Sequence, residues 1–249
     1  MLIVQSFDER RITPWLARCL LSVEQWAAHC GYTYCFAGDE LLDRLPGWYL
    51  DKVAPKMPVA TDLARLLWMQ ELLQEQTEVA WVDADVLIFA PAQLDVKIGA
   101  RGCVFGREYW LQQQDRKPRV YSNLHNAYCA FRRGNQTLGF LVETIMHLVD
   151  RVDPNHISPQ FVGPKLLNSL HSSADLPWDD RWGALSPLFA TELVQRGPKG
   201  VSRVLQRQQQ PLAALNLCLS LEGDTAVQWD TVIDRLQKYP DGLGGAGQK

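Results

Sequence analysis

The stretch "EVAWVDADVLIFAP", residues 78–91, decides the expected fold. Its apolar run is nearly continuous, which is typical of a central strand buried on both faces of a parallel sheet. Two carboxylates, Asp83 and Asp85, interrupt the run. A buried carboxylate is costly unless it is paired or binds a metal, so the sequence predicts a partner for these two side chains.

The residues before this stretch predict a strand, a helix and a second strand. "LIVQSF" at 2–7 is a short apolar strand, and "YTYCFAG" at 32–38 is the next one. Between them, Thr13 is a suitable N-cap, Pro14 suits the first helical position, and apolar residues recur at helical spacing up to Gly31. A turn-rich piece at 45–58 then leads to a helix at 59–76. This order predicts an α/β chain with a mostly parallel central sheet flanked by helices.

The second half is patterned less regularly. We expect a polar loop around 111–119, a strand in "NAYCAFRRGN" that ends in a turn, a helix at 137–150 and a short helix in "PKLLNSL". Further on we expect short strands near 183–190 and 212–221, a helix near 229–238 and a flexible tail at 241–249.

Composition excludes several classes of protein. The 249 residues are 47% hydrophobic and 21% charged with a net charge of −3, which predicts an ordinary globular chain without a nucleic-acid partner. The N-terminus fits neither a secretory signal nor a spanning helix, and no later apolar run is long enough to span a membrane. The six cysteines show no metal-ligand spacing. We therefore expect reduced thiols and a cytoplasmic protein.

The two carboxylates suggest a metal site. In an extended strand residues i and i+2 point to the same side, so Asp83 and Asp85 are expected to form one acidic patch. Mg²⁺ and Mn²⁺ prefer oxygen ligands of this kind and keep positions for water and substrate phosphates. Ligands of open α/β sheets also bind at the carboxyl ends of strands, where this pair is expected. The alternative is that Asp83 caps a turn and Asp85 pairs with a nearby Arg or Lys.

Asp62 and Arg65 lie three residues apart on the helix that precedes this strand, and therefore on one face of it. An ordinary surface ion pair would have the same pattern. Next to a metal and diphosphate site, however, the planar guanidinium of Arg65 is suited to phosphate or sugar hydroxyls.

A strand that ends in "DAD" (83–85), after a helix that contains "DLAR" (62–65), resembles the GT-A glycosyltransferases with a DXD motif. The resemblance is to the sugar transferases of capsule and mannan synthesis and to the glycosylating toxins. It implies a GT-A, Rossmann-like fold in one domain at 1–240, with a nucleotide-binding half at about 1–95 and an acceptor-side half at about 96–240. It also implies that Asp83 and Asp85 are catalytic and bind Mn²⁺ or Mg²⁺, and that Asp62, Arg65 and Asp83 bind the donor.

Two further segments resemble the same families. "SNLHNAYCAFRRGN" implies that Asn126 faces the sugar as a catalytic residue, and "FVGPKLLNSL" implies that Gly163 and Pro164 lie by the donor site. The alternatives are a strand-edge amide bonded to backbone for Asn126, and an ordinary helix start for Gly163 and Pro164.

These families often supply another metal ligand near the C-terminus. The candidates in this chain are Asp179, Asp180, Asp224, Asp230 and His171, and the sequence does not choose among them. Trp110, Trp178 and Trp182 lie outside the expected core helices and are candidates for stacking on a sugar, although aromatic side chains mostly serve packing.

The function implied is the metal-dependent transfer of a sugar, with retention, from a UDP- or GDP-sugar to an unknown hydroxyl acceptor. Haloacid-dehalogenase-like phosphatases also carry Asp-x-Asp at a strand end, but their motif continues to Thr or Val where this chain has Leu87, and it lies near the start of the domain. A non-catalytic nucleotide-sugar-binding module is the other alternative.

Overall fold

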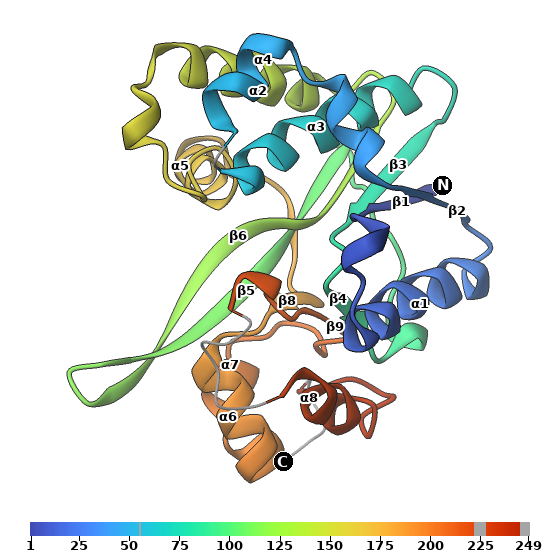
Figure 1. Cartoon of the computed structure of the whole chain (residues 1–249). Coiled ribbons are helices and arrows are strands. Elements are labelled where there is room, and N and C mark those ends of the chain that lie inside the picture. The colour runs from blue at the N-terminus through green and yellow to red at the C-terminus, as the bar shows by residue number, and fades with distance from the viewer. Residues whose placement is uncertain (55, 222–227, 245–249) are drawn as a thin grey trace.

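A computed structural model of the chain describes residues 1–54, 56–221 and 228–244. A six-stranded sheet runs through it in the order β2-β1-β3-β6-β5-β7, and helices lie on both faces (Figure 1). Three of the five strand pairings are parallel, which confirms the predicted α/β class with a mostly parallel central sheet. The strands are β1 (Leu2–Ser6), β2 (Thr33–Ala37), β3 (Glu78–Val82), β5 (Cys103–Gln114), β6 (Lys117–Arg132) and β7 (Trp178–Asp179).

The first strand, helix and strand form as expected. Helix α1 (Pro14–His29) begins with Pro14, whose fixed φ suits the first turn. It ends before Gly31, whose φ of +70° allows the chain to turn back toward β2. Because a helix joins them, β1 and β2 pair in parallel, and β3 then pairs in parallel on the other side of β1.

Strand β3 has apolar neighbours on both faces. Its side chains alternate, with Val79 and Trp81 in one hydrophobic core and Ala80 and Val82 in the other. The first core lies under α2 (Gly47–Val53), α3 (Met57–Leu72), α4 (Gln136–Arg151) and α5 (Pro164–Ala174), and the second under α1, α6 (Pro187–Arg196) and α8 (Trp229–Leu236). Helices α3, α4, α5 and α8 fall close to the expected ranges, whereas α2 lies in the segment expected to form turns.

The expected polar loop at 111–119 is wrong. Strands β5 and β6 form a long antiparallel hairpin that extends beyond the helices (Figure 1), and its two-residue turn is Asp115 and Arg116, both at positive φ. The glutamine-rich segment has little apolar alternation, so it gave no signal of a strand. The two strands form here because they satisfy each other's backbone hydrogen bonds. The register shifts after Phe105, and the hairpin therefore bends where it leaves the main sheet.

The expected continuous strand at 79–90 is also wrong. It breaks after β3, and β4 (Val86–Ile88) joins a second sheet of order β4-β9-β8 with β8 (Trp182–Ala184) and β9 (Ala214–Asn216). Only the start of 183–190 is a strand, because Ser186 caps α6 by accepting a bond from the Phe189 N–H.

The start of the expected tail is part of the fold. Leu243 is buried and pairs with Leu212 through backbone bonds of 2.8 Å in both directions. Residues 245–249 of the expected tail lie outside the described residues.

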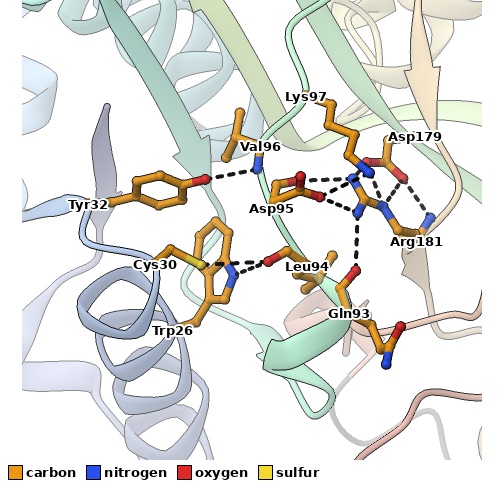
Figure 2. Close-up of polar contacts among 10 residues, drawn as sticks. All are labelled: Trp26, Cys30, Tyr32, Gln93, Leu94, Asp95, Val96, Lys97, Asp179 and Arg181. Atoms are coloured by element: carbon orange, nitrogen blue, oxygen red, sulfur yellow. Dashed lines mark hydrogen bonds and ion pairs between the residues drawn. The ribbon is translucent and has the colours of Figure 1, made fainter.

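Residues 94–96, which follow β4, form hydrogen bonds with Trp26 and Tyr32 on one side and with Arg181 on the other (Figure 2). Trp26 Nε1 of α1 donates to the Leu94 carbonyl at 3.1 Å, and the Val96 N–H donates to the Tyr32 hydroxyl at 3.3 Å. From the other side, Arg181 Nη1 donates to Asp95 at 2.6 Å. These bonds fix the connection between the two sheets.

All six cysteines have free thiols, and Cys19, Cys103 and Cys129 are buried. Among the described residues, no helix has the length and apolar character needed to cross a membrane.

Candidate functional site

Asp83 and Asp85 lie in the turn between β3 and β4. The Val86 N–H donates to the Asp83 carbonyl at 3.1 Å and closes this turn. The two carboxylates are therefore not alternate residues of one strand, as we expected, because β4 leaves the main sheet to pair with β9. The turn does lie at the carboxyl end of central strand β3, where ligands of α/β sheets bind.

Asp83 is held from behind by a buried arginine. Arg65 Nη1 of α3 donates to Asp83 Oδ1 at 2.9 Å, and Trp81 Nε1 donates to the same oxygen at 2.6 Å. Arg65 Nη2 donates to Asp62 Oδ1 at 2.6 Å, and side chains of both residues are 6% exposed. The pair is thus not the surface ion pair of the alternative interpretation, because both side chains are buried.

Asn126 and the start of α5 complete the surroundings of Asp62. Asn126 Nδ2 donates to Asp62 Oδ1 at 2.7 Å, and its carbonyl accepts from Arg65 Nη1 at 2.8 Å. Gly163 approaches so closely that a Cβ on it would lie 2.5 Å from Asp62 Oδ2. Pro164 occupies the first turn of α5, so the helix start and the close approach coincide.

Asp85 is held by residues that the sequence did not single out. Asn216 Nδ2 of β9 donates to Asp85 Oδ1 at 2.9 Å, and the Leu219 N–H donates to Oδ2 at 2.7 Å. Among the described residues, Asp85 therefore makes no pair with an Arg or Lys. Burial, and then the nearby charge of Asp83, raise the pKa of Asp85 to about 6.

Burial likewise raises the pKa of Asp62 to about 6, against the opposing effects of Arg65 and the Asn126 hydrogen bond. Three carboxylates, those of Asp62, Asp83 and Asp85, thus lie around a single guanidinium, that of Arg65. The excess negative charge favours a bound cation or proton at this end of the sheet.

A cavity of about 760 Å³ opens beside this turn. Among the expected site residues, Asp83, Asn126 and Pro164 line it. Asp62 and Arg65 are buried behind the wall, and the bonds that the Arg65 guanidinium makes in the described part of the chain go to oxygens of Thr61, Asp62, Asp83 and Asn126. In this arrangement they hold Asp83 and Asn126, and their expected contact with the donor stays a prediction.

The cavity also has a wall that the sequence did not predict. Glu108, Trp110 and Asn123 of the β5–β6 hairpin line it, together with Asn216 and Cys218 near β9. Tyr109 and Leu111 alternate with polar residues, and this alternation was the available signal for a strand at 107–112. The wall itself depends on pairing between distant residues, which leaves no local pattern in the sequence.

The remaining metal-ligand candidates lie in other contacts. Asp179 pairs with Arg181 at 2.6 Å (Figure 2), Asp180 accepts from the Gln209 N–H at 2.7 Å, and Asp230 pairs with Arg18 at 2.9 Å. His171 lies in the last turn of α5, and Asp224 lies outside the described residues. Within residues 1–54, 56–221 and 228–244, no group of three or more His, Cys, Asp or Glu side chains is arranged to hold a metal.

The three tryptophan candidates have different surroundings. Trp182 is buried and stacks on Tyr128 at 4.0 Å, and Trp178 packs against the Arg107 guanidinium at 4.0 Å. Only Trp110 of the three lines the cavity. Trp182 is therefore a core residue, and Trp110 is the candidate for contact with a ligand.

No family model matches the chain, and no curated protein matches it. Among solved structures, it is similar to a glycosyltransferase involved in the glycosylation of the major capsid of PBCV-1, with 9% identity, 95% of this chain and 98% of that chain covered, and a TM-score of 0.48. It is also similar to mouse xyloside xylosyltransferase 1, with 11% identity, 91% and 99% covered, and a TM-score of 0.46. The bifunctional glycosyltransferase WbbM gives 10% identity, 97% and 50% covered, and a TM-score of 0.47. Because all three TM-scores are below 0.5, these similarities do not carry a functional argument, and the case for a function depends on the geometry of the site.

Proposed function

We propose that this protein is a metal-dependent glycosyltransferase of the GT-A type, which transfers a sugar from a nucleoside diphosphate donor, a UDP- or GDP-sugar, to a hydroxyl acceptor. One observation carries the proposal. Asp83 and Asp85 lie in one turn at the carboxyl end of β3, Asp83 lines a cavity of about 760 Å³, and buried Arg65 fixes Asp83 in place.

The residues at this turn fit a divalent cation. Carboxylate oxygens are the ligands that Mg²⁺ and Mn²⁺ prefer, and Asp83 Oδ2 accepts no bond from another described residue. Asp83 and Asp85 would hold the ion, whose remaining positions suit water and phosphate oxygens. When bound, such an ion offsets the charge that grows on the departing diphosphate.

The protein residues contribute position and charge. Arg65 holds Asp83, and Asn216 with the Leu219 N–H holds Asp85, so neither carboxylate has to reorganise when the donor binds. Lys165 lines the cavity and adds a positive charge there. Asn126 of β6 lines the cavity and is the side chain that we place against the donor sugar, as the resemblance implies.

The direct test is turnover of a panel of UDP- and GDP-sugars with Mn²⁺, measured as release of free nucleotide. We expect release that depends on the metal and that Asp85→Asn abolishes. Asp51→Asn, at an exposed position in α2, is the matched control. Retention of anomeric configuration, which the resemblance implies, is tested by NMR of the product.

The alternatives give different results in the same assay. Phosphate release from simple phosphate esters without any response to nucleotide sugars would overturn the proposal in favour of a phosphatase. Metal-dependent binding of nucleotide sugars without turnover would favour a binding module. No observation in the described part of the chain favours either one.

A further inference from the structure

The cavity carries a second carboxylate away from the metal-binding turn. Glu108 lines it on β5, and of the described residues in its lining only Asp83 and Glu108 are acidic. Glu108 lies opposite Asn123 in the hairpin, and Asn123 Nδ2 donates to Glu108 Oε1 at 3.1 Å. Burial raises the pKa of Glu108, while His125 and the Asn123 bond act against the rise. The bond from Asn123 holds this carboxylate in one orientation.

The two carboxylates come from different elements of the cavity wall, Asp83 from the end of β3 and Glu108 from β5. The Asp83 N–H donates to the Ala127 carbonyl at 2.8 Å, which places the metal-binding turn beside Ala127 on β6. Asn123, the partner of Glu108, comes four residues earlier on the same strand. The register of the hairpin shifts between Cys129 and His125. Glu108 therefore belongs to the part of the hairpin beyond this shift, whereas Asp83 belongs to the end of β3.

The chemistry of Glu108 and Asn123 selects the groups that can bind there. A carboxylate only accepts hydrogen bonds, and it repels phosphate. Glu108 Oε2 and Asn123 Oδ1 accept no bond from another described residue. Both oxygens therefore suit a ligand that offers several O–H donors and carries no negative charge.

Trp110 adds an apolar surface to this part of the cavity wall. It follows Glu108 by two residues on β5 and so projects to the same side of the strand. It is partly exposed, and within the described part of the chain it makes no ring contact with another aromatic residue. A pyranose has hydroxyls at its rim and C–H groups on its faces, which matches two acceptor oxygens beside an indole.

We propose that Glu108, Asn123 and Trp110 form an acceptor subsite for a carbohydrate, so that the acceptor hydroxyl belongs to a sugar. This inference rests on the proposed glycosyltransferase function. It goes beyond that function in naming the acceptor class and three residues that bind it.

The experiment uses 4-nitrophenyl glycosides of several hexoses and pentoses as acceptor probes, with a serine-containing peptide and a long-chain alcohol as non-carbohydrate probes. Transfer to each probe is measured against hydrolysis of the same nucleotide sugar by water. Binding of each glycoside is measured separately by saturation-transfer NMR, which needs no turnover. The variants are Glu108→Gln, which keeps the size of the side chain, and Trp110→Ala, with Glu143→Gln on the exposed face of α4 as control.

We expect at least one glycoside to accept sugar, and Glu108→Gln to lower the ratio of transfer to hydrolysis by about tenfold or more, because a hydrogen bond to a charged group is lost. Trp110→Ala should lower the same ratio, and Glu143→Gln should match the unmodified protein. Transfer to the peptide or alcohol but to no glycoside would overturn the inference, as would a Glu108→Gln ratio equal to that of Glu143→Gln.

Failure of the proposed function has a different signature. If no nucleotide sugar turns over, the glycosyltransferase proposal fails, and the NMR result still decides the subsite. Glycoside signals that disappear in Glu108→Gln and Trp110→Ala support the subsite, and the absence of glycoside binding to the unmodified protein overturns it.

Discussion

Replacing Gly163 by alanine tests whether the buried network around Asp62 supports the site. The added Cβ would lie 2.5 Å from Asp62 Oδ2 and 3.1 Å from Asn126 Nδ2, so at least one of these groups has to move. Asp62 is 5% exposed, and its Oδ1 accepts bonds from both Arg65 and Asn126, which limits any rotation of the carboxylate.

The size of the effect follows from these contacts. Overpacking a filled site costs about 1–3 kcal/mol of unfolding free energy. In a chain of this size that corresponds to a fall in melting temperature of about 2–12 °C. Because Arg65 bonds both Asp62 and Asp83, we also expect weaker binding of UDP or GDP with Mn²⁺.

The assays are urea denaturation and calorimetric binding of UDP and GDP in the presence of Mn²⁺. Gly99→Ala is the matched control, because a Cβ at Gly99 meets no atom within 4 Å. If Gly163→Ala and Gly99→Ala have the same stability and the same nucleotide affinity, the close packing of α5 on Asp62 does not support the site and the reasoning is refuted.

Three other predictions concern buried groups. The pKa of Asp62 is raised from 3.8 to about 6 in the folded protein, so the folded state binds a proton more tightly than the unfolded state. Metal-free protein should therefore gain stability as pH falls from 7.5 to 5, with about 1.4 kcal/mol of the gain coming from Asp62, and an equal gain in Asp62→Asn would contradict this. Arg181→Met leaves buried Asp179 without its ion-pair partner and should lower the unfolding free energy by about 3–5 kcal/mol in urea denaturation; a change below about 1 kcal/mol would contradict this. Burial raises the pKa of Cys19 and raises that of Cys129 to about 12, so both thiols stay protonated at neutral pH. Of these two and the partly exposed Cys35, a thiol reagent should label Cys35 first in native protein, and equal labelling of all three would contradict the burial of Cys19 and Cys129.

The sequence alone determined the first strand–helix–strand unit of the fold and its central strand. Apolar spacing, Pro14 at a helix start and Gly31 after its end are local signals, and they located β1, α1 and β2 to within about two residues. The apolar run after residue 78 located central strand β3 and placed Asp83 at its carboxyl end. The spacing of Asp62 and Arg65 put both on one face of α3, where they do form an ion pair.

Tertiary structure decided the rest, because the forces involved act between residues far apart in the chain. Whether 79–90 was one strand or two depended on β9, more than 120 residues later, whose pairing draws β4 out of the main sheet. The burial of Asp62 and Arg65 came from packing around α3, and no residue type or spacing distinguishes that pair from one on the surface. The wall formed by Glu108 and Asn123 likewise exists only because the β5–β6 register brings two polar residues 15 positions apart into contact at the cavity.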